Sequence, residues 1–184
     1  MAKGGSELHR RGLLLGALSA TLGGCGFHPM YQRASSGQLG TTSRELAAVS
    51  VDIIGDRPGQ LLRQALQERL EGSGSGVARR YDLAVGFGIS GEGIAIRQDN
   101  SVTRIRMIGR AEWTLRAQDL ARTVLTRDTA RAVDDLNILN EQFFAADLET
   151  EVVQKRLAER LADQVVMQLA SYFNRRADQA ASSG

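Results

Sequence analysis

The side chain best suited to covalent chemistry is Cys25, the only cysteine among the 184 residues. An apolar run, Gly12–Gly24, precedes it and follows a basic start at Arg10 and Arg11. A basic start, an apolar stretch too short to cross a bilayer and small residues before a cut are typical of a secretory signal peptide. We therefore expect residues 1–24 to be removed, which makes Cys25 the first residue of the mature chain.

Cys25 also has the neighbours that a lipid anchor requires. Leu22-Gly23-Gly24-Cys25 resembles the lipobox of bacterial lipoproteins, in which the thiol takes a diacylglyceryl group and the new amino terminus is acylated. Several acyl chains together anchor a protein stably. The alternative is an ordinary signal peptide with a chance cysteine. Residue 26 is glycine rather than the aspartate that retains lipoproteins at the inner membrane of enteric bacteria, so we expect an anchor on the periplasmic side of the outer membrane.

The export route stays open between two pathways. His9-Arg10-Arg11-Gly12-Leu13-Leu14 is a partial match to a twin-arginine signal. Basic residues are also normal at this place in a Sec signal peptide. We favour Sec export because the twin-arginine match is incomplete.

Arginines between residues 97 and 131 form a second group of side chains, one that could bind an anionic ligand. This segment contains eight arginines against four acidic residues. Guanidinium groups form charge-assisted, often paired hydrogen bonds with phosphate and carboxylate oxygens. The alternative is a solvated strand face whose arginines pair with neighbouring acids. We expect a contact for anionic groups beside a hairpin tip at Asp99-Asn100-Ser101, made by Arg97, Arg104 and Arg106, with Arg110 as a more distant candidate.

The sequence contains no recognisable catalytic, cofactor or metal constellation. His28 is the only histidine that remains after cleavage, so neither a metal cluster nor a serine–histidine pair is supported. Gly86–Gly91 has the glycine pattern of dinucleotide sites, but a strand follows it where such a site needs a helix. Asp134 and Asp135 could be a carboxylate pair, but neighbours on a strand point to opposite faces, and in a loop such a pair is usually solvated. We expect no enzyme activity, no cofactor and no metal.

The charge balance argues against generic nucleic-acid binding. The whole chain has a formal net charge of +2. Residues 1–24 contain three basic side chains and one acidic side chain, so the predicted mature chain is formally neutral. Its roughly 160 residues are enough for one domain with its own hydrophobic core.

Hydrophobic periodicity predicts four strands and two helices in the rest of the chain. Apolar and polar residues alternate in four segments, which is the pattern of half-buried strands. Apolar residues recur at helical spacing in two others. Short turns favour antiparallel pairing of neighbouring strands. The predicted elements are strands near 49–53, 81–96, 104–116 and 121–132, and helices near 58–71 and 147–175.

The order β-α-β-β-β-α predicts an α+β fold of two layers. Both helices are expected to pack on one face of a mostly antiparallel four-stranded sheet, because each must bury its apolar stripe. The arginine-bearing positions then lie on the opposite face. The expected division is a signal peptide (1–24), a lipidated N-terminus and polar tether (25–45), the folded domain (46–176) and a flexible tail (177–184).

Three segments carry a resemblance to a known family. They are Cys25-Gly26-Phe27-His28-Pro29-Met30-Tyr31 after the predicted cut, Asn137–Ala145, and Gln168–Phe173 near the end of the last helix. These segments resemble the LPS-assembly lipoprotein LptE in its alphaproteobacterial form. The predicted order of strands and helices agrees with that family, so the resemblance covers the whole mature chain.

The resemblance implies a role and two partners. Members of the family sit as a plug in the lumen of the outer-membrane β-barrel LptD, assist its assembly and bind lipopolysaccharide on its way to the outer leaflet. Lipopolysaccharide carries phosphates or other acidic groups, for which an arginine face is suited. Two alternatives stay open. One is a generic envelope lipoprotein with another partner, and the other is an envelope hydrolase, which would need a nucleophile–base pair that the sequence does not show.

Overall fold

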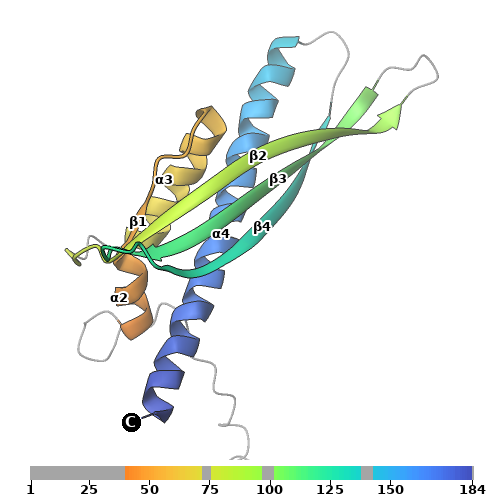
Figure 1. The fold of residues 1–184 in the computed structure, drawn as a ribbon. Helices are drawn as coiled ribbons and strands as arrows, with labels where there is room; N and C mark the ends of the chain where they lie inside the picture. Colours follow the sequence, from red (N-terminus) through yellow and green to blue (C-terminus); the bar gives the residue numbers. More distant parts are fainter. Residues whose placement is uncertain (1–39, 72–75, 97–101, 138–142, 184) are drawn as a thin grey trace, which may run out of the picture. The chain divides into compact units, whose positions relative to one another are not determined.

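The computed structural model describes residues 40–71, 76–96, 102–137 and 143–183. All of them belong to one compact unit, Arg33–Gly184. The predicted signal peptide, Cys25 and Arg97 lie outside the described residues. The elements are α2 (Thr41–Ala47), β1 (Val49–Val51), α3 (Arg57–Glu71), β2 (Tyr81–Ile96), β3 (Val102–Ala117), β4 (Val124–Asn137) and α4 (Phe143–Ser182), as Figure 1 shows.

The predicted α+β architecture is confirmed. The four strands form one sheet in the order β1-β2-β3-β4. β1 pairs with β2 in parallel, and β2, β3 and β4 form an antiparallel meander. The helices α3 and α4 lie on one face of the sheet, and the described part of the chain leaves the other face uncovered (Figure 1).

Alternation along β3 decides which of its side chains enter the core. Ala111, Trp113 and Leu115 are buried against the helices, whereas the arginines of β3 occupy the even-numbered positions that point away. The indole of Trp113 donates a hydrogen bond of 2.8 Å to Oε1 of Gln168 on α4. This bond satisfies the one polar atom that the tryptophan brings into the core.

The central contact between sheet and helix depends on a missing side chain. At Gly109 of β3, an added Cβ would lie 3.0 Å from Cδ1 of Leu161 on α4. Leu157 and Leu161 are fully buried. Glycine at this position therefore lets α4 approach the middle of the sheet more closely than any other residue would allow.

One helix was not predicted from the sequence. The sequence predicts a polar tether up to residue 45, but Thr41–Glu45 begin α2, whose Leu46 and Ala47 are buried. Glu45 accepts a hydrogen bond of 2.7 Å from the hydroxyl of Tyr81 and lies 3.0 Å from the guanidinium of Arg80. The pKa of Tyr81 is raised, chiefly by burial of the side chain and secondly by its hydrogen bond to Glu45. Contacts distant in sequence hold α2, which has no apolar stripe of its own.

The last helix is longer than predicted at both ends. α4 contains 40 residues, where the sequence suggested a helix over 147–175 and a flexible tail over 177–184. Its buried stripe ends at Phe173, which packs on Tyr81 with ring centroids 5.3 Å apart. Beyond that point alanine, arginine and glutamine continue the helix because their intrinsic helix propensity is high. Among the described residues, no helix combines the length and apolarity needed to cross a membrane.

Candidate functional site

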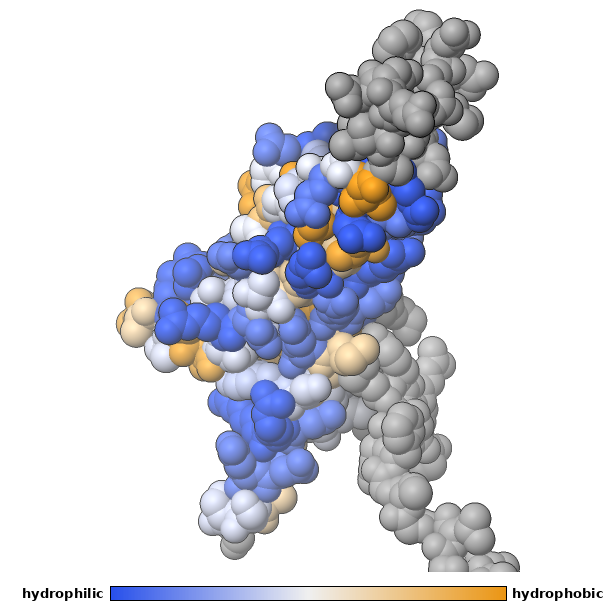
Figure 2. Space-filling view, turned by 90° about the vertical axis from the view of Figure 1, so that its right-hand side faces the viewer, coloured by the Kyte–Doolittle hydropathy of each residue, from blue (hydrophilic) through white to orange (hydrophobic). Residues whose placement is uncertain are grey.

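The uncovered face of the sheet carries the described arginines that the sequence singled out. Arg104, Arg106 and Arg110 are all exposed and occupy alternate positions of β3. The residues between them face α4 or are partly covered. We call the side of β2, β3 and β4 that points away from the helices the outer face. Figure 2 shows the side of the molecule that lies on the right in Figure 1, and its surface is dominated by hydrophilic residues with smaller hydrophobic groups.

Near the hairpin end, the arginines of the outer face have an acidic partner. A guanidinium nitrogen of Arg104 lies 2.7 Å from Oδ2 of Asp135, and Nε of Arg106 lies 3.6 Å from its Oδ1. The carboxylate of Asp135 on β4 thus forms ion pairs with two arginines on β3. The structure therefore fits the alternative of a self-paired strand face for these two residues.

The two neighbouring aspartates lie on β4 and point to opposite sides of the sheet. Asp135 lies on the outer face with Arg104 and Arg106. Asp134 points to the helix side, where Oδ2 lies 3.6 Å from Nε of Arg156 and 3.9 Å from a guanidinium nitrogen of Arg160. The two carboxylates consequently do not form a catalytic pair.

Arg110 has a different environment from the other two arginines. It lies directly opposite Arg131 of β4, and both side chains are exposed. The backbone N–H of Arg131 donates to Gln164 of α4, away from β3. The two arginines therefore form a non-hydrogen-bonded pair, the type in which opposing side chains come closest. Neither has an ion pair within the described part of the chain.

Two like charges directly opposite each other on a sheet destabilise it unless an anion lies between them. Arg110 and Arg131, which we call the arginine pair, are therefore the strongest candidates on the outer face for binding an anionic group from outside. The sequence had not singled out Arg131. Its importance depends on the register between β3 and β4, which composition and spacing do not reveal.

The arginine pair borders an open hollow of about 600 Å³. Its floor is part of β2, where glycines take the place of larger side chains. Two carboxylates, from Glu92 and Glu112, lie in the same hollow and limit its positive charge. The hollow is lined by Gly86, Phe87, Gly88, Ile89, Ser90, Glu92, Ile108, Arg110, Glu112 and Arg131.

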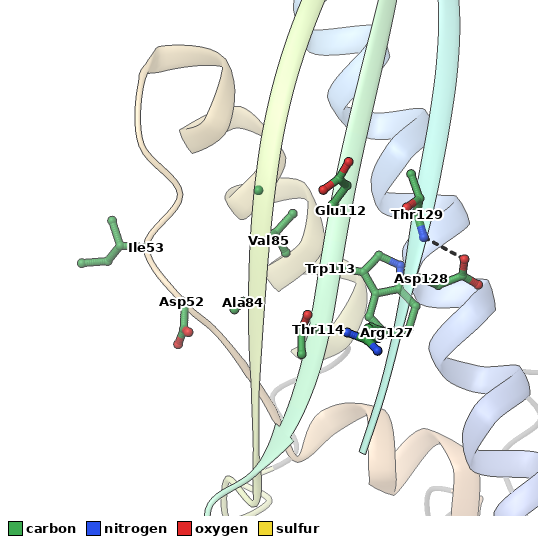
Figure 3. A pocket seen from close by; sticks show the side chains of 11 residues that line it. Asp52, Ile53, Ala84, Val85, Glu112, Trp113, Thr114, Arg127, Asp128 and Thr129 are labelled. Carbon is green, nitrogen blue, oxygen red and sulfur yellow. Dashed lines mark hydrogen bonds between the residues drawn. The ribbon is translucent and has the colours of Figure 1, made fainter. Parts of the chain in front are cut away.

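A second hollow of about 620 Å³ continues from the first toward β1, and the two share Gly86 and Glu112. Figure 3 shows its walls: Asp52 and Ile53 follow β1, and residues of β2, β3 and β4 lie opposite. The side chain of Ile53 points away from the sheet and is 87% exposed. Within the described residues, no group of histidine, cysteine and carboxylate side chains could hold a metal ion.

Comparison with known proteins places this geometry in a family context. A family model described as LptE, lipopolysaccharide-assembly, matches residues 46–169. No curated protein matches the chain by sequence.

Solved structures share the fold at low sequence identity. A putative lipoprotein from Caulobacter crescentus superposes with a TM-score of 0.59 at 18% identity, covering 72% of this chain and 96% of that one. The rare lipoprotein B from Shewanella oneidensis gives 0.51 at 15% identity, with coverages of 67% and 92%. A minor lipoprotein from Acinetobacter baumannii gives 0.51 at 16% identity, with coverages of 69% and 91%.

Proposed function

Because the chain belongs to the LptE family of lipopolysaccharide-assembly proteins, we propose that it is an outer-membrane lipoprotein that plugs the LptD β-barrel and binds lipopolysaccharide. The observation that carries this proposal is the family match, which covers residues 46–169 and so nearly the whole folded domain. As an LptE-family lipoprotein, the chain assists assembly of the barrel and takes part in delivering lipopolysaccharide to the outer leaflet. Its role is binding and assembly rather than catalysis.

The outer face supports a contact with an anionic lipid. The arginine pair has no acidic partner among the described residues, and it borders a hollow with room for a phosphate and part of a sugar. Charge-assisted hydrogen bonds to phosphate are the strongest that arginine makes. Arg104 and Arg106 stay candidates, but each must exchange its contact with Asp135 to bind a ligand.

The polar outer face also suits the interior of a large barrel. Barrel lumens are polar, so a plug must present hydrophilic side chains to them. The outer face presents arginines and carboxylates, and the hydrophobic core lies on the helix side. The domain can therefore enter such a lumen without exposing its core.

The barrel partnership predicts a stable complex. Affinity purification of the tagged full-length chain from detergent-solubilised envelopes is expected to recover LptD in about equal amount. A plug inside a barrel contacts it over a large interface, and large interfaces form stable complexes. Depletion of the chain should lower the amount of correctly assembled barrel and of surface lipopolysaccharide. Recovery of a different envelope protein, with normal barrel and lipopolysaccharide after depletion, would favour the generic lipoprotein.

Lipidation predicts a mass difference at the amino terminus. Wild-type protein extracted from membranes is expected to begin at an acylated Cys25, as judged by intact-mass and peptide mass spectrometry. Cys25→Ala removes the thiol and should leave an unacylated precursor. Gly23→Ala is the matched control, because it keeps a small residue before the cysteine and should be processed normally. An unmodified Cys25 thiol in the mature wild-type chain would refute the anchor.

A further inference from the structure

The two edges of the sheet differ in how their backbone groups are satisfied. On the β4 edge, side chains of α4 take the place of a neighbouring strand. Arg160 donates to the carbonyl of Val133 at 2.7 Å. Gln164 accepts from the N–H of Arg131 at 3.1 Å, and Gln168 donates to the carbonyl of Thr129 at 3.2 Å. Residues four apart on one helix face thus cover backbone groups two apart on β4. The middle of this edge, Thr129–Val133, is therefore closed to a further strand.

Among the described residues, the β2 edge has backbone hydrogen-bond partners only at its beginning. β1 pairs with Tyr81, Asp82 and Leu83 and goes no further. There the N–H of Tyr81 donates to Ala48 at 3.2 Å, and the carbonyl of Leu83 accepts from Asp52 at 3.0 Å. Odd-numbered residues of β2 therefore direct their N–H and C=O groups away from β3.

The same alternation leaves a row of backbone groups without a partner further along β2. Val85, Phe87, Ile89 and Gly91 continue the odd-numbered series beyond the end of β1. In the described part of the chain, no backbone or side-chain group hydrogen-bonds to their edge-facing N–H and C=O groups. We call Val85–Gly91 the free edge.

The free edge lacks the charges, prolines and bulges that protect edges against strand pairing. Natural edge strands are kept from pairing by lysine, proline, inward charges or a bulge. From Val85 to Gly91 there is no charged residue and no proline, and the register with β3 is regular until Gly93. The first charge on this strand beyond Asp82 is Glu92.

The side chains of the free edge are suited to a strand lying beside them. Toward the helices, Val85, Phe87 and Ile89 are only half-buried, which leaves apolar surface for a neighbour to cover. On the outer face, a Cβ at Gly88 would meet nothing within 4 Å, and one at Gly86 only the Glu112 carbonyl at 3.8 Å. This chain's own packing does not require these glycines. Glycine inside a strand often marks the close approach of another backbone.

We propose that the free edge accepts an extended segment of the partner barrel protein by strand addition. The inference rests on the proposed function, because the partner is the barrel named there. The added segment would carry apolar side chains at alternate positions, over Val85, Phe87 and Ile89. Between them it would carry an acidic side chain that passes over Gly88 to Arg110, which lies opposite Gly88 in register and has no acidic partner in the described residues. Backbone hydrogen bonds supply affinity in this mode, and alternate side chains supply specificity.

Hydrogen exchange on the complex tests this assignment directly. The full-length lipidated chain, alone and co-purified with the barrel in detergent, is compared by exchange with residue-level readout. Even-numbered amides of β2 already bond to β3, so they serve as internal controls. We expect the amides of Val85, Phe87, Ile89 and Gly91 to exchange at least about tenfold more slowly in the complex.

A proline variant provides an independent measurement. Ile89→Pro removes an N–H that points away from β3 toward the free edge, so no hydrogen bond to β3 is lost. Ile89→Ala is the matched control, because it removes the same apolar side chain but keeps the N–H. We expect less barrel to co-purify with Ile89→Pro than with Ile89→Ala.

The outcomes separate this inference from the function on which it rests. A complex that forms with unchanged exchange at the four odd-numbered amides would overturn strand addition and leave the barrel partnership standing. Failure of the wild-type chain to bind the barrel would overturn both. Protection of the same amides without barrel, together with a doubled mass in solution, would show that a second copy of this chain occupies the edge, and would also overturn the proposal.

Discussion

Replacing Arg110 and Arg131 together by glutamate is expected to lower the affinity for lipopolysaccharide by at least about tenfold at low salt, because a charge-assisted hydrogen bond contributes roughly 1.5–3 kcal/mol. The fold should survive the change. Both side chains are exposed and have no ion pair among the described residues, so no internal contact is lost. Binding of purified, detergent-dispersed lipopolysaccharide by the mature chain, measured across a salt series, checks the prediction.

A matched variant separates the effect of where the charges lie from the effect of how many charges are changed. Arg116 and Arg127 lie on the same face of the same two strands, at the opposite end from the hairpin. Their double replacement by glutamate changes the net charge by the same amount and should change affinity much less. Screening by salt should narrow the difference between the two variants, since exposed charges more than a Debye length apart are largely screened. Equal losses in both variants would mean that the outer face acts only through its total charge.

Arg104 and Arg106 give a different expectation, because the structure shows where their charges already go. Both contact Asp135, whose side chain is 29% exposed. Replacing either arginine removes a contact within the chain as well as any contact with a ligand. Loss of binding in such a variant is therefore ambiguous. The arginine pair has no such contact among the described residues, and the binding assay contains no barrel to supply the acidic partner proposed for Arg110. The pair is therefore the better test of lipid binding.

The fold was largely predictable because its dominant signals are local. Alternation in β2 and β3 and the apolar stripe of α4 determine which side of each element is buried, and these patterns are visible in a single sequence. The short turn near Asp119 could be recognised by its composition, and there the N–H and hydroxyl of Thr123 hydrogen-bond to the Asp119 carboxylate and lower its pKa. Strands, helices and turns that depend on such patterns of neighbouring residues could therefore be predicted from the sequence.

The unpredicted features depend on contacts between distant residues. α2 is held in place by Glu45 with Tyr81 and Arg80, and no pattern within Thr41–Ala47 announces those contacts. The same limit applies to the candidate site. The sequence identified an excess of arginine, but only the register places Arg131 opposite Arg110 and both Arg104 and Arg106 beside Asp135. The role of Arg97 stays a prediction, because that residue lies outside the described ones.

Leu161→Ala is expected to destabilise the domain by about 2–5 kcal/mol, because it removes a fully buried side chain and leaves a cavity at the joint between α4 and the sheet. Met167→Ala on the same helix is the control, since that side chain is 56% exposed and should contribute far less. Urea unfolding of the mature chain can be followed by the fluorescence of Trp113, the only tryptophan, which is buried beside this joint.

Introducing Gly109→Ala into the wild type and into the Leu161→Ala variant tests why glycine lies opposite Leu161. In the wild type, the new Cβ lies 3.0 Å from Cδ1 of Leu161 and forces that side chain to move, so we expect a loss of up to about 1–3 kcal/mol from overpacking. In the Leu161→Ala background the obstructing atom is gone. Alanine also has a lower conformational entropy cost than glycine, so the second change should be neutral or slightly stabilising there. The two changes should therefore couple favourably in a double-mutant cycle. Additive effects would show that Gly109 is not what allows α4 its close approach, and that the joint is held by the remaining contacts of the helix.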